Sequence, residues 1–170
     1  TKALGSKDWW KTAGMNWNPW ICSNWLTCVM LCEKDPAKRQ QAVTEIEGCM
    51  RAFIDAYPAD GGCDEGTGYW DRAAASLFEC LDLMKQVRDD SLATVTVLDY
   101  QRDKVARMGA YIYNMYIANG YSVNFADAHE NKSVAQLNVL WPFALYLGDD
   151  AMKGFAAWLA KDKDFWTNPA

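Results

Sequence analysis

The side chains best suited to chemistry gather in a Gly-rich stretch, residues 58–72. It holds four glycines and four carboxylates, together with Tyr69, Trp70 and Arg72. Glycines permit positive-φ turns and close approach of the backbone to a ligand. Carboxylates can serve as acid and base in glycoside hydrolysis, and a tyrosine can accept and return a proton. The stretch therefore predicts a functional loop; a plain connector with solvated carboxylates is the alternative.

Two other stretches carry uncharged or titratable polar groups. Residues 16–20 read Asn-Trp-Asn-Pro-Trp, and Asn24 follows them. Their amides can bind a ligand, or they can cap helices and form turns. Residues 121–131 form a second polar segment, which contains His129, the single histidine of the chain. Both stretches are candidate parts of a site.

The composition limits the class of partner. Of the 170 residues, 51% are hydrophobic and 14% are aromatic, so a folded domain with its own core is expected. Nine tryptophans exceed what such a core needs, and surplus aromatic rings often stack on the apolar faces of sugars. The alternative is that most of these tryptophans pack between helices. A net charge of −5 argues against nucleic acid as a partner.

Cysteine spacing gives little support to a metal centre. The six cysteines include no Cys-x-x-Cys pair, and one histidine leaves little to complete a zinc site. Buried free thiols are therefore predicted, and neither a metal nor another cofactor is expected. The sequence shows no signal peptide and no membrane-spanning run. Its abrupt ends lead us to expect a piece of a longer protein.

Helical spacing of apolar residues predicts a single all-α domain over residues 1–170. Asp35-Pro36 is a typical helix start, an N-cap followed by proline in the first turn. Asn119-Gly120 is interpreted as a helix stop, and Pro142 as a kink. Residues 91–98 are ambiguous between a short strand and the start of the next helix. The predicted helices cover residues 19–32, 36–57, 71–88, 100–118, 133–146 and 149–160.

Short connections between these helices indicate a series of antiparallel helical hairpins. Alternate connections then emerge on the same face of the array. Residues 16–20, 58–70 and 121–131 are separated by two helices in each case, so they are expected to share a face and form one cleft. The catalytic candidates in this cleft are Asn16, Asn18, Tyr69 and His129.

Residues 16–24 (Asn-Trp-Asn-Pro-Trp, then Asn24) and 60–70 (Asp-Gly-Gly-Cys-Asp-Glu-Gly-Thr-Gly-Tyr-Trp) resemble the heparinase II/III-like polysaccharide lyases. Residues 124–127, Asn-Phe-Ala-Asp, also resemble a segment of such proteins, and the resemblance covers most of the chain. In that family an incomplete α/α toroid precedes a β-sandwich domain. The resemblance implies that these hairpins form the later part of such a toroid. The remaining toroid helices and the β-sandwich would be partners within the parent chain.

The resemblance implies β-elimination at a uronic acid of an acidic polysaccharide, such as a glycosaminoglycan or alginate. A base removes the proton at C5 while neutral or cationic donors bind the adjacent carboxylate. Tyr69 matches the family's catalytic tyrosine, which acts as base and then acid once neighbours lower its high intrinsic pKa. Asn16 or Asn18 matches the family's carboxylate-binding amide.

Two departures from the family pattern matter. Trp17 and Pro19 flank the asparagines where active relatives commonly carry a histidine, and a further histidine usually comes from the β-sandwich. His129 would substitute only if its loop folds over the cleft, so the chain alone is expected to be inactive. The resemblance also implies a periplasmic or secreted protein. The candidate substrate-binding residues are Trp17, Trp20, Asn24, Glu65, Trp70 and Arg72.

Two other classes of function stay open. A glycoside hydrolase on an α/α toroid would take its acid and base from a pair of carboxylates in the Gly-rich stretch. A non-catalytic module, or a degenerate lyase, would bind glycans without turnover. The products separate these cases, because a lyase leaves a C4–C5 double bond that absorbs ultraviolet light, whereas a hydrolase adds water. The carboxylates for the hydrolase are Asp60, Asp64, Glu65 and Asp71.

Overall fold

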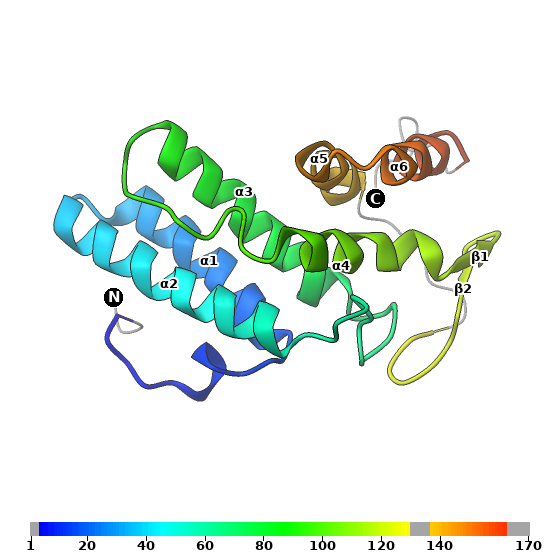
Figure 1. Cartoon of the computed structure of the whole chain (residues 1–170), viewed down its shortest axis with the longest axis horizontal. Helices are drawn as coiled ribbons and strands as arrows, with labels where there is room; N and C mark the ends of the chain where they lie inside the picture. Colours follow the sequence, from blue (N-terminus) through cyan, green and yellow to red (C-terminus); the bar gives the residue numbers. More distant parts are fainter. Residues whose placement is uncertain (1–3, 130–136, 163–170) are drawn as a thin grey trace.

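The computed structural model describes residues 4–129 and 137–162 as a helical protein with one small β-hairpin (Figure 1). Within these residues the α-helices are α1 (Trp17–Cys32), α2 (Pro36–Ala56), α3 (Ser76–Asp89), α4 (Arg102–Asn114), α5 (Leu137–Leu147) and α6 (Asp150–Asp162). The shorter elements are a 3-10 turn (Trp9–Lys11), a π-helical turn (Asp71–Ala75) and the strands β1 (Tyr116–Ala118) and β2 (Tyr121–Ser122). The predicted all-α class is confirmed, whereas its place in a toroid stays a prediction. The predicted start of the fifth helix, residue 133, lies outside the described residues.

Capping side chains define the starts of α2 and α6. The Oδ1 atom of Asp35 accepts hydrogen bonds from the backbone N–H groups of Ala37 at 2.9 Å and Lys38 at 3.5 Å, so the predicted N-cap is confirmed. The Oδ1 atom of Asp149 accepts one from the N–H of Met152 at 3.0 Å. Both carboxylates also face the positive end of a helix dipole.

α1 begins at Trp17, ahead of the predicted start at residue 19 or 20. Pro19 lies in the first turn of the helix, where a backbone N–H has no helical acceptor and where the fixed φ of proline is suitable. Buried Asn18 precedes this proline and still adopts helical backbone. Tertiary packing therefore overrides the usual preference of such a residue for extended backbone.

Residues 116–122 form a hairpin instead of the end of a long helix. β1 pairs antiparallel with β2. Between them Asn119 and Gly120 have φ values of 53° and 85°, the left-handed pair that a two-residue hairpin turn requires. The helix predicted to reach residue 118 therefore ends at Asn114. The same Asn-Gly signal serves a hairpin turn as well as a helix end.

Residues 91–98 are neither a strand nor the start of a helix. The buried carboxylate of Glu47 on α2 holds this segment instead. It accepts hydrogen bonds from the backbone N–H groups of Thr96 and Val97, the latter at 2.9 Å, and from the Thr96 hydroxyl at 3.1 Å. A side chain thus supplies the acceptors that a strand or helix would otherwise provide.

The helices share one core. α1 packs against both α2 and α3, while α5 pairs with α6 and contacts α3 and α4 (Figure 1). Phe78 on α3 stacks on Phe143 of α5 with ring centroids 4.5 Å apart, and Phe143 stacks on Trp70 at 6.5 Å. This aromatic stack joins the two groups of helices into a continuous cluster of buried apolar side chains.

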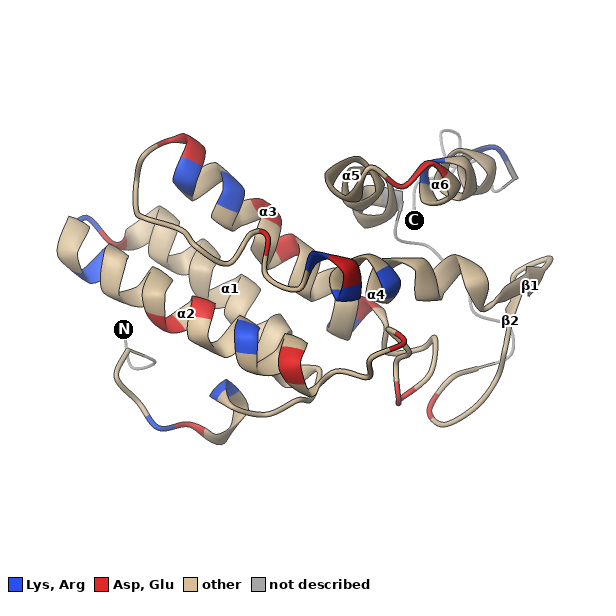
Figure 2. Cartoon of the chain, in the orientation of Figure 1, with Lys and Arg blue, Asp and Glu red and all other residues tan. Residues whose placement is uncertain are grey.

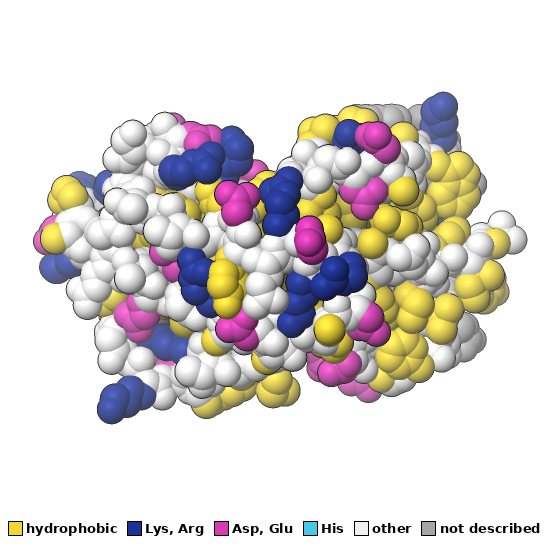
Figure 3. Space-filling view, viewed as in Figure 1, with side chains coloured by type: hydrophobic (Ala, Val, Ile, Leu, Met, Phe, Trp, Pro, Cys, Tyr) yellow, Lys and Arg dark blue, Asp and Glu magenta, His cyan; other side chains and the backbone are white. Residues whose placement is uncertain are grey.

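Charged and apolar side chains are distributed differently over the surface. Figure 2 shows acidic and basic residues interspersed along α3. Figure 3 shows hydrophobic side chains gathered over the end of the molecule that carries the β-hairpin. The large apolar side chains exposed in and just after the hairpin are Ile117, Tyr121, Val123 and Phe125.

Candidate functional site

The three predicted loops meet at one end of the helices. The Gly-rich stretch packs on residues 125–128, since a Cβ at Gly66 would lie only 2.6 Å from the carbonyl oxygen of Phe125. On its other side, the guanidinium carbon of Arg72 lies 4.6 Å from the ring centroid of Trp20. The loops adjoin, whereas the expectation that they form one cleft stays a prediction. The close backbone approach that glycine permits is made here to a neighbouring loop.

Arg72, Trp20 and Trp17 form a partly exposed stack. The Trp20 and Trp17 rings lie 5.3 Å apart at an interplanar angle of 28°. Trp17 is 45% exposed and the Arg72 side chain 44%. Arg72 also pairs with Asp71 at 3.3 Å, and a pair so exposed to water contributes little stability. The stack therefore offers an aromatic face and a cation that can exchange its partner.

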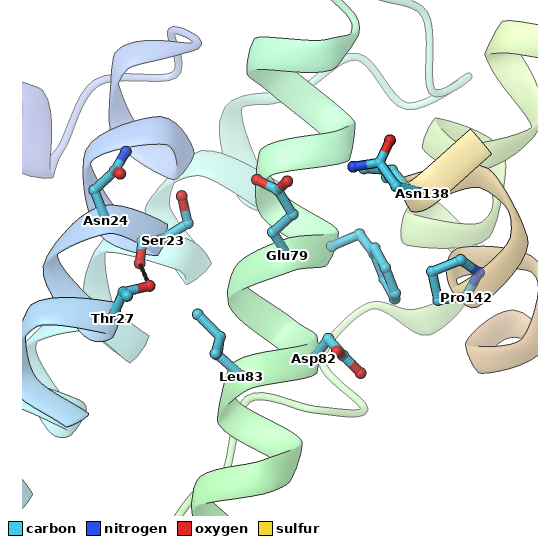
Figure 4. A pocket seen from close by; sticks show the side chains of 10 residues that line it. Ser23, Asn24, Thr27, Glu79, Asp82, Leu83, Asn138 and Pro142 are labelled. Carbon is cyan, nitrogen blue, oxygen red and sulfur yellow. Dashed lines mark hydrogen bonds between the residues drawn. The ribbon is translucent and has the colours of Figure 1, made fainter. Parts of the chain in front are cut away.

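A cavity of about 400 Å³, which we call the α1–α3–α5 cleft, opens between these three helices (Figure 4). Figure 4 shows Glu79 of α3 between Asn24 of α1 on one side and Asn138 of α5 on the other. Asn24 also links the cleft to the stack, because its Nδ2 donates a hydrogen bond to the Trp20 carbonyl oxygen at 2.7 Å. Carboxylates and amides in one cavity can bind the hydroxyl groups of a sugar.

Glu79 is the titratable group of this cleft with a perturbed protonation equilibrium. Loss of solvation between the helices raises its pKa; Arg72 lowers it and Asp71 raises it. A carboxyl with a raised pKa keeps its proton to higher pH, which suits a general acid. Asp82 lies three residues further along α3 and adds a second carboxylate to the cleft.

The Gly-rich loop is locally acidic around Glu65. Partial burial raises the pKa of Glu65, and the charges of Asp127 and Asp64 raise it further. Such surroundings disfavour an anion. Glu65 is therefore better suited to accept hydrogen bonds from sugar hydroxyls than to contact a carboxylate of a substrate.

Asn18 is not available to a ligand, which corrects its predicted role. It is fully buried, and its Nδ2 donates to the carbonyl oxygens of Lys11 and Ala13, each at 3.2 Å, and of Cys49 at 3.0 Å. Its Oδ1 lies 3.6 Å from the Cys22 thiol. The amide ties the N-terminal segment to α1 and α2, so it cannot also bind a carboxylate.

Trp70 is likewise excluded from contact with a substrate. It is buried, and its indole Nε1 donates to the Met108 carbonyl oxygen of α4 at 2.8 Å. The ring stacks on Phe143 within the core. Its predicted substrate-binding role is therefore wrong, and the side chain anchors the Gly-rich loop to the helices.

Tyr69 and His129 are exposed on adjoining loops, while Asn16 is buried just before α1. Asn16 caps no backbone N–H of that helix. The backbones of the two loops adjoin: a Cβ at Gly68 would lie 3.3 Å from the Cα of Ala128. Tyr69, His129 and Asn16 are not among the described residues that line the α1–α3–α5 cleft.

Glu79, Asp82 and Asn138 do not stand out in the sequence. The spacing of Glu79 and Asp82 does place both carboxylates on neighbouring positions of one helix surface, which is the local signal that points to them. No local signal points to Asn138, because it lines the cleft only through the packing of α5 against α3.

All six cysteines are free. The prediction of buried thiols is confirmed for four of them and wrong for Cys28 and Cys32, which are exposed on α1. Within the described ranges, His, Cys, Asp and Glu side chains form no group of three or more that would hold a metal ion.

Comparison with known proteins adds no relatives, because no family model and no curated protein matches the chain. In the part of the chain that the structure describes, no helix has the length and apolar character needed to cross a membrane. The functional conclusion therefore rests on the residues of the site.

Proposed function

We propose that the chain is the helical part of a polysaccharide lyase that cleaves a uronic-acid polysaccharide by β-elimination. The observation that carries the proposal is the Arg72–Trp20–Trp17 stack, in which a cation and an exposed aromatic face adjoin a polar cleft. A uronate sugar presents both an apolar ring face and a carboxylate. Ring stacking and charge pairing by neighbouring groups match these two features.

The backbone presents Tyr69 next to Arg72. The N–H groups of Arg72 and Ala73 both donate to the Tyr69 carbonyl oxygen at 3.0 Å. The Tyr69 side chain is exposed. The candidate base and the candidate carboxylate-binding cation are thus neighbours in one helical turn, and proton removal next to a carboxylate needs both groups close together.

The proposed reaction moves one proton and two electron pairs. Tyr69 as phenolate takes the C5 proton, the C5–H electrons form the C4–C5 double bond, and the C4–O bond breaks with its electron pair leaving on the oxygen. The phenol then returns the proton to the leaving oxygen. Arg72 holds the C6 carboxylate as charge develops on it, and Asn16 is the remaining candidate for a neutral donor to that group.

The proposal extends to the surroundings of the chain. A histidine and the rest of the cleft would come from further toroid helices and a β-sandwich domain, and the protein would work in the periplasm or outside the cell, where acidic polysaccharides occur. His129 lies on the loop that packs on the Gly-rich stretch and is the candidate from this chain itself.

A second candidate, glycoside hydrolysis, is favoured by one observation. Glu79 has a raised pKa and shares the α1–α3–α5 cleft with Asp82. These two carboxylates, rather than a pair from the Gly-rich stretch, would supply the acid and the base. A cleft with two carboxylates also disfavours a polyanion, so this candidate predicts a neutral glycan.

Turnover of a panel of polysaccharides separates these functions. The protein that carries this chain, its Tyr69→Phe variant and a Tyr121→Phe control are incubated with heparan sulfate, hyaluronan, alginate and a neutral β-glucan. Ultraviolet absorbance from unsaturated ends that Tyr69→Phe abolishes and Tyr121→Phe preserves supports the lyase. Reducing ends without absorbance, lost in Glu79→Gln, support the hydrolase. No unsaturated product and no binding of any uronate polymer contradicts the lyase, and no reducing ends from any of the four polysaccharides contradicts the hydrolase.

A further inference from the structure

Two of the six cysteines, Cys28 and Cys32, lie exposed on α1, whereas the other four are buried. Both belong to the regular helix, which continues to Cys32 and closes with a hydrogen bond of 3.0 Å from the Glu33 N–H to the Val29 carbonyl oxygen. Their four-residue spacing makes them neighbours on one helix surface, with Cβ atoms about 5–6 Å apart. The helix therefore presents two thiols to solvent at a fixed separation.

This separation does not suit a disulfide within the helix. A disulfide needs Cβ atoms about 3.5–4.5 Å apart, which is closer than positions on successive turns of an α-helix come. A metal–thiolate bond is about 2.3 Å long, so an ion held in line between two sulfurs separates them by roughly 4–5 Å. Each sulfur can reach such a position by rotation about its Cα–Cβ bond. The pair is thus arranged to hold an ion between its sulfurs rather than to form a disulfide.

The available ligands restrict the ion to one that two thiolates can satisfy. Structural zinc requires four ligands in a tetrahedral arrangement, and the described residues contain no group of three or more His, Cys, Asp or Glu side chains that would hold a metal ion. Calcium and magnesium prefer oxygen ligands. Monovalent copper prefers soft thiolate ligands and accepts two of them in a linear arrangement. Cu(I) is therefore the ion that this pair fits best.

The charges at this end of α1 are compatible with such a complex, whose ion and two thiolates carry one net negative charge. The Nη2 of Arg39 donates a hydrogen bond of 2.8 Å to the Glu33 carbonyl oxygen, so a cation lies where the carbonyl groups of a helix end disfavour an anion. Asp90, beyond α3, lines a cavity together with Leu31 and adds an acid on that side. In residues 33–39 and at position 90, basic and acidic side chains balance: Lys34, Lys38 and Arg39 against Glu33, Asp35 and Asp90. The surroundings are therefore close to neutral.

We propose that Cys28 and Cys32 form a binding site for one Cu(I) ion on each chain. Both thiols lose their protons to solvent and two Cu–S bonds form, while neither copper nor sulfur changes its oxidation state. The ion lies on the solvent-facing side of α1, held across one turn of the helix. The site does not depend on the polysaccharide chemistry proposed above.

Competition with a chromophoric chelator tests the proposal. The protein is titrated, without oxygen, into Cu(I) held by bicinchoninate, and loss of the colour of the chelate reports transfer of the ion to the chain. We expect one ion per chain, and Cys28→Ser and Cys32→Ser each to weaken binding at least about a hundredfold. The matched control is the double variant Thr27→Cys/Cys28→Ser. It keeps two exposed thiols on α1 but places them five residues apart, so we expect the same loss.

The pH dependence and the mass of the loaded protein distinguish this site from other modes of binding. Because both thiols must ionise, the affinity should fall by up to about a hundredfold per pH unit below the ordinary thiol pKa, against about tenfold for one thiolate. Sedimentation should give the same mass with and without copper. Four results overturn the proposal: no ion leaves the chelator; a single-cysteine variant or the control binds as tightly as the parent; the pH dependence is that of one thiolate; or copper joins two chains.

Discussion

Two polar regions of the molecule use the same residue types in opposite ways. In the buried region, the side chains of Asn18 and Glu47 are enclosed and bonded to backbone groups of segments distant in sequence. In the α1–α3–α5 cleft, Asn24 and Glu79 lie on exposed helix surface next to a cavity. Each region contains one asparagine from α1 and one glutamate from a neighbouring helix.

The difference shows how a structural polar group is told from a functional one. A buried amide or carboxylate that bonds several backbone groups stabilises the fold and has no capacity left for a ligand. A polar group beside a cavity keeps unused donors or acceptors, and folding gains little from it. Residue type and sequence motif do not separate the two cases, whereas burial and hydrogen-bond partners do.

The largest expected effect comes from replacing the side-chain amide of Asn18 by a carboxylate. Asn18→Asp places a carboxylate against the carbonyl oxygens that the amide now binds, so we expect a loss of about 4 kcal/mol in the free energy of unfolding. Asn24→Asp removes one exposed hydrogen bond and should cost about 0.5 kcal/mol or less. Urea titration of both variants measures the difference, and equal losses would contradict the distinction between the two regions.

A smaller effect is expected at the glutamates. Glu47→Gln replaces one acceptor oxygen by an N–H donor facing the backbone N–H groups of residues 96 and 97, and should destabilise the protein by about 2 kcal/mol. The matched change Glu79→Gln should alter the free energy of unfolding by less than about 0.5 kcal/mol. Hydrogen exchange of residues 94–98 provides an independent check, because only Glu47→Gln should speed it.

The third prediction concerns binding rather than stability. If the Arg72–Trp20–Trp17 stack binds uronate polymers, Trp17→Ala should weaken their binding about tenfold while the free energy of unfolding changes by less than about 1 kcal/mol. Trp141, a similarly exposed tryptophan on α5, provides the control. The same loss of affinity in Trp141→Ala would show that any exposed tryptophan suffices.

The smallest effect is a dependence of stability on pH. Folding raises the pKa of Glu79, so the folded chain binds this proton more tightly than the unfolded chain. The contribution of Glu79 to the free energy of unfolding therefore falls as the pH rises from the ordinary pKa of a glutamate through the raised pKa of the folded state. Glu79→Gln should flatten this part of the curve and be relatively more stable at neutral pH. Solvent exposure keeps the effect small, and an unchanged pH profile would show that the cleft does not perturb Glu79.

Sequence patterns predicted the elements whose signals are local. The Asp35 cap and the apolar periodicity of the helices depend on neighbours within one or two turns, and these predictions are confirmed. The end of α4 was wrong because Asn-Gly suits two structures, and pairing of β1 with β2 selects between them. Residues 91–98 were ambiguous because their hydrogen-bond partner, Glu47, lies on another helix.

For the candidate site too, features with a local sequence signal were predictable, and features that depend on tertiary packing were not. The sequence by itself determined that the chain is helical and that its loops carry the amides, carboxylates and aromatic rings, because apolar periodicity and residue type decide such features. Only the tertiary structure decided that Asn18 and Trp70 are internal, that Arg72 stacks on Trp20, and that Glu79 enters a cleft. Burial and hydrogen-bond partners depend on which helices pack together. No single segment of the sequence specifies that packing.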